Sequence, residues 1–249
     1  MDGSQGSERE WTRVKGLIGY FLHSYTVSQR FFGPVAGVII AVLILYSYKP
    51  NPVMSSYSAT AVFLFIACAW LGLSFLNHEQ AVQKQVVIVQ LRSARRYSIG
   101  GLLTMVLLTL LLDVVIVMYP VLTGSFHEPA GLQRILLGLA GHALMGLLGI
   151  TLSLYLQSSW VPRAGYAAGM MLILLILSIS AGKVAEVVPG PVVSILLPPV
   201  YPVMDRMMNA ETLPVSSVLG AYAHALAYIL LLAGFYIYRS GRMDYNKTI

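Results

Sequence analysis

Charged residues are scarce in this chain. Only 10% of its 249 residues are Asp, Glu, Lys or Arg, whereas 57% are hydrophobic. A soluble domain carries about 25% charged residues, so this composition cannot cover a globule with polar surface. We therefore predict that lipid is the solvent for most of the chain.

Cysteine and metal-ligand clusters are also missing. The one cysteine, Cys68, lies in an apolar run and has no partner for an internal disulfide. No Cys/His cluster of the kind that structural zinc needs is present, so we predict no metal site. The net charge of +6 is better explained by basic residues held on the cytoplasmic side of a membrane than by a nucleic-acid partner.

Motifs of membrane enzymes are absent from the sequence. His78-Glu79 continues as Gln80-Ala81-Val82 and does not complete an H-E-x-x-H zinc motif. There is no rhomboid-like Gly-x-Ser-Gly, no pair of adjacent glutamates and no G-x-x-x-x-G-K-[ST] phosphate loop. We therefore predict that the chain is not an enzyme and holds no cofactor of its own.

Long apolar runs are what the sequence does contain. About 20 mostly apolar residues cross about 30 Å of hydrocarbon, and continuous runs without alternation favour helices over a membrane barrel. We predict an all-α integral membrane protein that forms one domain over residues 1–249. Its six predicted spans are 31–48, 55–76, 98–123, 131–156, 164–187 and 215–238.

Two further apolar segments do not fit a span. Residues 11–30 place Trp11, Val14, Ile18, Leu22 and Tyr25 at helical spacing, which predicts a helix lying in the membrane interface. An extension of the first span is the alternative. Residues 188–213 are apolar but hold five prolines, which break long helices. We predict short helical pieces there, either dipping into the outer leaflet as a re-entrant hairpin or covering the bundle.

Lys and Arg set the predicted orientation. With a cytoplasmic N-terminus, twelve of them fall on the inner side and four on the outer side, which together make the sixteen in the chain. Basic residues concentrate on the cytoplasmic side of membrane proteins. We predict a multi-pass protein of the cell membrane with both termini in the cytoplasm.

The segment 77–96 between the second and third spans is amphipathic. Val82, Val86 and Val89 follow an i, i+4, i+7 pattern. The pattern has two interpretations. The helix rests on lipid headgroups, or it docks onto a cytoplasmic partner.

With this segment in place, the whole chain resembles the membrane subunit of type-2 ABC transporters, the export permeases that work with a separate ATPase. Those subunits have an interfacial N-terminal helix, six spans, a short coupling helix between spans two and three, and an outer hydrophobic hairpin between spans five and six. The predicted elements follow that order along the sequence.

Local residues carry part of the resemblance. Glu79 matches the acidic residue of the family motif, Ser93 with Arg95 or Arg96 matches its small-residue/Arg pair, and Gly100 matches its glycine. The chain departs from the motif elsewhere. It has Gly101 where Lys is common, Arg92 near the usual Pro, and no Gly-Thr after Glu79.

The resemblance implies partners and a function. A cytoplasmic ATPase would bind ATP and Mg, and a second permease copy or paralogue would complete a dimer in the lipid. The pair would export an amphipathic cargo: a peptide, a lipid-linked molecule or a drug. We expect Glu79, Gln83 and Lys84 on the side that meets the ATPase, within a coupling set of Glu79, Gln83, Lys84, Val86, Val89, Arg92, Arg95 and Arg96. The alternative function is a non-transporting immunity or sensor protein that binds its ligand in the bilayer.

Three ionisable residues lie inside predicted spans. Asp113 is surrounded by leucines and valines, at an insertion cost of about 2.5–3.5 kcal/mol. His142 and His224 lie at a similar distance from the cytoplasmic ends of their spans, so the three are predicted to share one layer that lines a gate or a transport path. The alternative is that each is satisfied locally.

Glycine pairs and one ion pair complete the predicted features. Gly33 with Gly37, and Gly165 with Gly169, form G-x-x-x-G pairs that permit close helix approach. They fall on spans one and five, which meet at the dimer interface in the family that the chain resembles. Packing within one chain is the alternative. Lys183 and Glu186 are predicted to form an i, i+3 pair.

Overall fold

The chain folds into helices. The computed structural model describes residues 3–242, with side chains from residue 15 onward, so Trp11 and Val14 lie outside the described side chains. Over the described residues the only β pairing is an isolated bridge between Asn51 and Phe126. The helices are α1 Gly3–Val27, α2 Phe32–Leu45, α3 Val53–Leu76, α4 Ala81–Leu91, α5 Ala94–Leu122, α6 Gly131–Leu154, α7 Ala164–Ile179, α8 Ala181–Val184, α9 Gly190–Leu196, α10 Val200–Met208 and α11 Val215–Ser240.

Four of these helices, α3, α5, α6 and α11, are long and apolar enough to cross a membrane. Residues 15–27 of α1 and helix α2 together are also long and apolar enough to cross a membrane, but the two helices are bent by 80° relative to each other. Helix α7 is apolar and has 16 residues, fewer than a full span needs. The composition and these helices together define an all-helical, multi-pass membrane protein.

The first and fifth predicted spans are shorter as helices than the apolar runs suggested. Helix α2 ends at Leu45, before Pro50 and Pro52, which cannot continue a helix because they lack a backbone N–H. Helix α7 ends at Ile179, and the single turn of α8 follows. Gly182 in α8 allows α10 to approach closely, because a Cβ there would lie 2.5 Å from the Tyr201 ring of α10.

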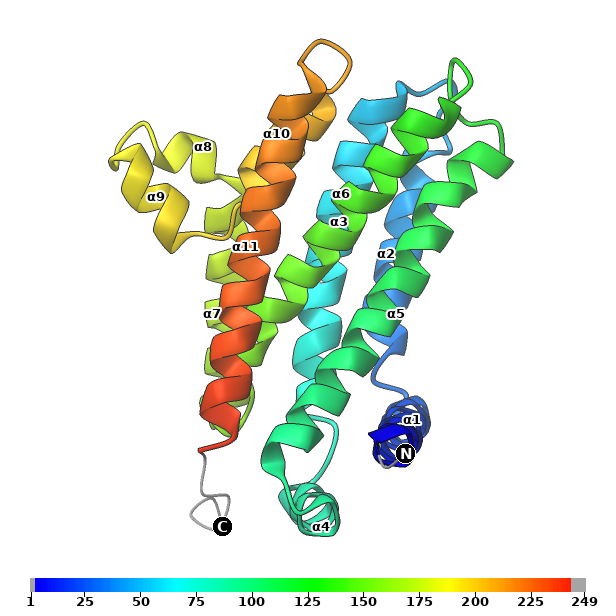
Figure 1. Cartoon of the computed structure of the whole chain (residues 1–249). Coiled ribbons are helices and arrows are strands. Elements are labelled where there is room, and N and C mark those ends of the chain that lie inside the picture. The colour runs from blue at the N-terminus through cyan, green and yellow to red at the C-terminus, as the bar shows by residue number, and fades with distance from the viewer. Residues whose placement is uncertain (1–2, 243–249) are drawn as a thin grey trace.

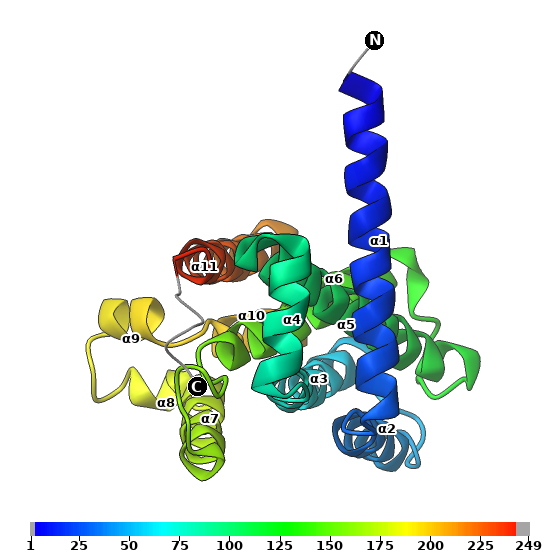
Figure 2. The ribbon, with the colours of Figure 1, turned by 90° about the horizontal axis from the view of Figure 1, so that it is seen from below.

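Helices α3 and α6 form the centre of the bundle and have the most extensive contact of any helix pair. Helices α2 and α5 lie to one side of this pair, and α7 and α11 lie to the other (Figure 1). Helices α1 and α4 lie across one end of the bundle, which Figure 2 shows from below. Because of the 80° bend, residues 15–27 of α1 do not continue α2 in a straight line.

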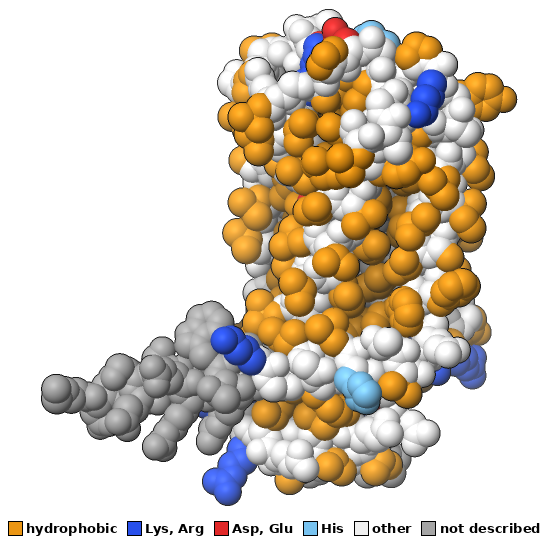
Figure 3. All heavy atoms as spheres, turned by 90° about the vertical axis from the view of Figure 1, so that its right-hand side faces the viewer, with side chains coloured by type: hydrophobic (Ala, Val, Ile, Leu, Met, Phe, Trp, Pro, Cys, Tyr) orange, Lys and Arg blue, Asp and Glu red, His pale blue; other side chains and the backbone are white. Residues whose placement is uncertain are grey.

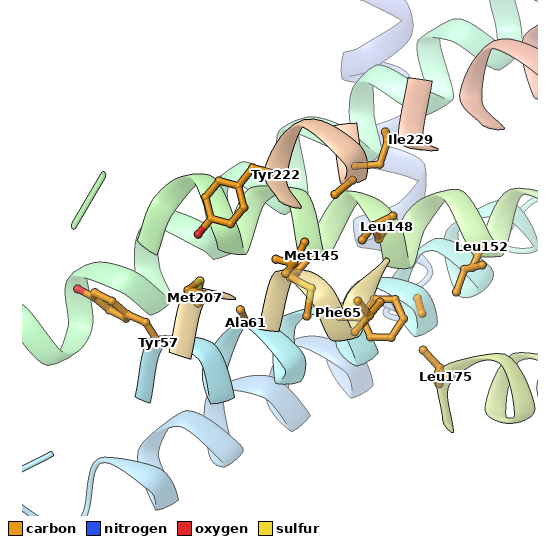
Figure 4. Packing of buried hydrophobic residues seen from close by; sticks show 14 of the residues in the cluster. Tyr57, Ala61, Phe65, Met145, Leu148, Leu152, Leu175, Met207, Tyr222 and Ile229 are labelled. Carbon is orange, nitrogen blue, oxygen red and sulfur yellow. The ribbon is translucent and has the colours of Figure 1, made fainter. Parts of the chain in front are cut away.

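Glycines on α6 let the central helices approach closely. At Gly149, a Cβ would lie 2.3 Å from the Phe65 carbonyl oxygen and 2.8 Å from the Ala69 backbone nitrogen, so the two backbones touch. Buried side chains fill the space around this contact, among them Met145 and Leu148 (Figure 4). Such packing leaves no room for added atoms.

On the face of the bundle that Figure 3 shows, apolar side chains cover the middle, whereas Lys and Arg lie near the two ends. A protein that crosses a membrane has this distribution, with apolar side chains in the hydrocarbon layer and charged side chains at the two interfaces. The distribution agrees with the multi-pass membrane assignment.

Residues 188–213 form α9 and α10, joined by prolines. Helix α10 is part of the core, because Val200, Val203 and Met207 are fully buried. The Ser58 hydroxyl of α3 donates a hydrogen bond to the Met204 carbonyl at 2.8 Å. This part of the segment therefore covers the bundle. Helix α9 projects from the side of the bundle beside α8 (Figures 1 and 2).

Candidate functional site

The corner between α4 and α5 is built by local hydrogen bonds. Helix α4 begins with a capping box, in which the Gln80 backbone N–H donates to the Gln83 side-chain oxygen at 3.3 Å. It ends at Arg92, which adopts the left-handed conformation with φ 52°. The Ser93 hydroxyl then accepts from the Arg96 backbone N–H at 3.2 Å and caps α5. The Gln83 side chain, predicted to meet a partner, therefore serves the helix start.

Two charged residues of this segment turn toward the bundle. The Tyr97 hydroxyl of α5 donates a hydrogen bond to the Glu79 carboxylate, and the Lys84 Nζ lies 5.5 Å from the centre of the Tyr97 ring. Burial lowers the pKa of the Lys84 ammonium, and the nearby Glu79 carboxylate offsets part of that shift. Both side chains therefore contact the start of α5, whereas the sequence predicted them on the side of α4 that meets a partner.

The valines of α4 face away from the bundle. The exposed fractions are 67% for Val82, 51% for Val86 and 74% for Val89. We call these three residues the valine face. Arg92, Arg95 and Arg96 are exposed near the C-terminal end of α4. The arrangement presents an apolar stripe beside a basic edge, at the end of the bundle where α1 also lies (Figures 1 and 2).

His142 is fully buried and satisfied within the bundle. Its Nδ1–H donates to the Gly138 carbonyl at 2.7 Å, which leaves Nε2 to accept from the Thr60 hydroxyl at 2.8 Å. This geometry suits a neutral ring that holds α6 to α3. These contacts agree with the alternative that the polar groups of His142 are satisfied by hydrogen bonds within the bundle.

Asp113 is buried and less well satisfied. Its exposed fraction is 3%, and its Oδ1 has no hydrogen-bond partner among the described residues. Gly146 of α6 lies against Thr109 and Cys68. Asp113 is one helical turn from Thr109, and His142 is one turn from Gly146 in the same direction along the bundle.

Asp113 and His142 therefore lie at one level along the bundle, and His224 does not face them. His224 is exposed on α11, where Tyr222 faces inward instead. The Tyr222 hydroxyl donates to the Leu137 carbonyl at 2.9 Å. Two of the three predicted residues are thus buried inside the bundle, and the third lies on its outer surface.

The predicted glycine pairs have different surroundings. Gly33 lies against the Trp70 ring of α3, with a Cβ position 3.1 Å from that ring, so it serves packing within the chain. Gly37, Gly165 and Gly169 have nothing within 4 Å of a Cβ position. Their surfaces are open to a neighbour or to lipid.

Lys183 and Glu186 form the predicted pair at 2.8 Å. With exposed fractions of 82% and 64% for the two side chains, such a surface pair contributes little to stability.

Tyr97 was not foreseen as part of the site. It lies 18 residues after Glu79, and no sequence pattern links them. Among the described residues, no group of three or more His, Cys, Asp or Glu side chains could hold a metal ion. No family model, curated protein or solved structure matches the chain.

Proposed function

We propose that the chain is the membrane-spanning permease subunit of an ATP-driven ABC exporter for an amphipathic cargo: a peptide, a lipid-linked molecule or a drug. The observation that carries the proposal is α4. An eleven-residue helix lies at one end of the bundle between two long apolar helices and exposes an apolar stripe there. In this proposal the valine face docks into a groove on a separate cytoplasmic ATPase, which binds ATP and Mg.

The energetics favour valines over charges as the anchors of such a contact. Fully burying a valine side chain contributes about 1.5–3 kcal/mol, whereas charges at the rim of an interface contribute little each. Val82, Val86 and Val89 are all more than half exposed in the single chain. The nearby arginines would then fix the angle of docking.

Glu79 and Lys84 take a different role within the same proposal. Because both contact Tyr97 at the start of α5, they link α4 to a long apolar helix. Movement imposed on α4 by an ATPase would pass through this contact into the bundle. Reversing the two charges would therefore loosen α4 itself, and it would not report on the partner surface.

Further features support the permease proposal. The chain has an N-terminal helix bent by 80° from α2, and short helices between α7 and α11. In the proposed topology α2, α3, α5, α6, α7 and α11 are the six spans, both termini are cytoplasmic, and two permeases pair through the open glycine surfaces of α2 and α7. The twelve-to-four distribution of Lys and Arg supports this orientation.

The test is a substitution on the valine face. The chain is purified from its native membrane, and the copurifying polypeptide is assayed for ATP hydrolysis. Val86→Glu with Val89→Glu is expected to reduce recovered ATPase activity by about tenfold or more, because charged side chains cannot enter an apolar groove. Val187→Glu is the matched control, since Val187 is 87% exposed and lies beyond α7 and α8, away from α4.

Two results would contradict the proposal. One is a wild-type chain that brings down no polypeptide with a phosphate-binding loop and ATPase activity. The other is a Val86→Glu, Val89→Glu chain that retains its ATPase and its transport rate. The second result would make α4 a headgroup anchor.

A further inference from the structure

A cleft of about 410 Å³ lies between the start of α5 and the end of α11. Ligand-binding clefts span about 300–1,000 Å³, whereas one water takes about 30 Å³. The cleft is therefore large enough for a small ligand or for part of a larger one. Its lining residues are Arg95, Gly234, Ile237, Tyr238, Gly241 and Arg242.

The polar end of the cleft carries two positive charges. Arg95 belongs to the first turn of α5, and Arg242 lies two residues after the end of α11. The Arg95 Cβ is 3.8 Å from the Cβ position at Gly241, so the two chain segments meet there. Among residues 15–242, no carboxylate forms an ion pair with either guanidinium group. Planar guanidinium groups bind phosphate oxygens through paired hydrogen bonds.

One of the two arginines is held in place by an aromatic ring. The Arg242 guanidinium lies 4.4 Å from the centre of the Tyr238 ring. This contact orients the charge at the mouth of the cleft. Tyr is enriched at membrane interfaces, where its ring meets hydrocarbon and its hydroxyl meets water. Tyr238 lies near the end of the apolar helix α11, which suits the cleft to a lipid headgroup.

The other wall of the cleft is apolar and continues along α11. Nothing lies within 4 Å of a Cβ position at Gly234, one turn above Tyr238, so space is open there. Leu230 and Leu231, one turn further, are 62% and 74% exposed. A chain-like apolar group leaving the cleft would therefore follow an exposed apolar track.

We propose that this cleft binds an anionic phospholipid, with the headgroup phosphate between Arg95 and Arg242 and an acyl chain along Gly234 and Leu230 of α11. Basic pockets between membrane helices bind anionic headgroups in this way. The apolar track selects a lipid over a free phosphate ion. The proposal does not depend on the permease function.

The experiment compares lipids on the delipidated full-length chain in detergent. Binding of phosphatidylglycerol, phosphatidylcholine and glycerol phosphate is measured by native mass spectrometry, and the thermal unfolding midpoint is measured with each. We expect one tightly held phosphatidylglycerol per chain. Phosphatidylcholine and glycerol phosphate should bind at least about tenfold more weakly.

Substitutions locate the site. Arg95→Gln with Arg242→Gln should weaken phosphatidylglycerol binding by about tenfold or more, and each single change should give a smaller loss. Arg163→Gln with Arg239→Gln is the matched control. It removes the same charge from the same end of the bundle, it includes an arginine stacked on a tyrosine at 5.4 Å, and neither residue lines the cleft. Both cleft arginines are exposed, so the unfolding midpoint without lipid should not change.

Any of three outcomes would overturn the proposal. If the cleft variant binds phosphatidylglycerol as well as the control variant does, the lipid binds elsewhere. If glycerol phosphate binds as tightly as phosphatidylglycerol, the cleft is a free-anion site. If phosphatidylcholine binds equally well, the two arginines select no headgroup charge.

Discussion

The Lys84 ammonium of α4 lies 5.5 Å from the centre of the Tyr97 ring of α5. The same tyrosine donates its hydroxyl hydrogen to Glu79, just before α4. One aromatic side chain thus holds both a cation and an anion that precede it in the sequence. Helix α4 is fixed to the bundle by its charges, which leaves its apolar stripe outside.

Tyr97→Phe should loosen α4 while the spans stay intact. A hydrogen bond to a charged group contributes about 1.5–3 kcal/mol, and about 1.4 kcal/mol corresponds to a factor of ten. We expect the backbone amides of residues 81–91 to exchange with deuterium about tenfold faster or more. Tyr166→Phe is the control, since its hydroxyl contacts only exposed Arg163 at the start of α7. Unchanged exchange in α4 would contradict the role assigned to Tyr97.

Lys84 should make stability depend on pH in the alkaline range. Burial lowers the pKa of its ammonium in the folded chain, so the unfolded chain binds this proton more tightly. Stability therefore rises with pH between the lowered pKa and the ordinary value of about 10.4. Lys84→Met should remove this contribution.

The measurement for Lys84 is a difference between two proteins. The thermal unfolding midpoints of the wild type and of Lys84→Met are compared from about pH 8 to about pH 10.5. Tyrosine ionisation affects both proteins and largely cancels in the difference. We expect the unfolding midpoint of the wild type to rise relative to that of Lys84→Met as the pH increases. A difference in midpoint that stays constant with pH would show that Lys84 is not buried.

Asp113 is expected to lower the stability of the folded chain, and it is a candidate for a role in transport. Its Oδ1 is buried without a partner among the described residues, and an unsatisfied buried polar atom costs about 1–3 kcal/mol. We expect Asp113→Val to raise the unfolding midpoint. If the carboxylate lines a transport path, Asp113→Asn should lower export at unchanged expression. A lower midpoint for Asp113→Val would mean that the carboxylate is stabilised by a partner such as bound water.

Two glycines should respond oppositely to alanine. A Cβ at Gly149 would lie 2.3 Å from the Phe65 carbonyl oxygen, so Gly149→Ala should force α3 and α6 apart at a cost of about 1–3 kcal/mol or more. Gly169 has open space around it, and alanine there should be neutral or slightly stabilising, because alanine is the better helix former. Unfolding midpoints test both. Equal loss in the two variants would contradict the packing described for α6.

Gly169 also bears on pairing between two copies of the chain. If α7 packs against a second copy of the chain through this surface, Gly169→Leu should weaken self-association while the single chain keeps its unfolding midpoint. Cross-linking in the membrane measures that association. No change in cross-linking would mean that the surface faces lipid.

The apolar runs predicted the long helices well, because hydrocarbon thickness fixes their length. Helices α3, α5, α6 and α11 begin and end within four residues of their predicted spans. The rotation of a helix about its own axis was not predictable in this way. His224 faces outward because Tyr222 packs against Gly141, and distance along the helix says nothing of that. The orientation of α4 likewise depends on Tyr97, which no local pattern indicates.

The contact between α3 and α6 at Gly149 has a consequence for motion. Two helices whose backbones touch cannot slide past one another by small steps, because each step would drive side chains into backbone atoms. We therefore expect α3 and α6 to move as one rigid body. The outer helices, which are less tightly packed, would move relative to this pair as rigid units. If the chain works as the proposed permease, distance labels placed on α3 and α6 should keep one separation through the transport cycle, while labels on α7 and α11 should report two separations.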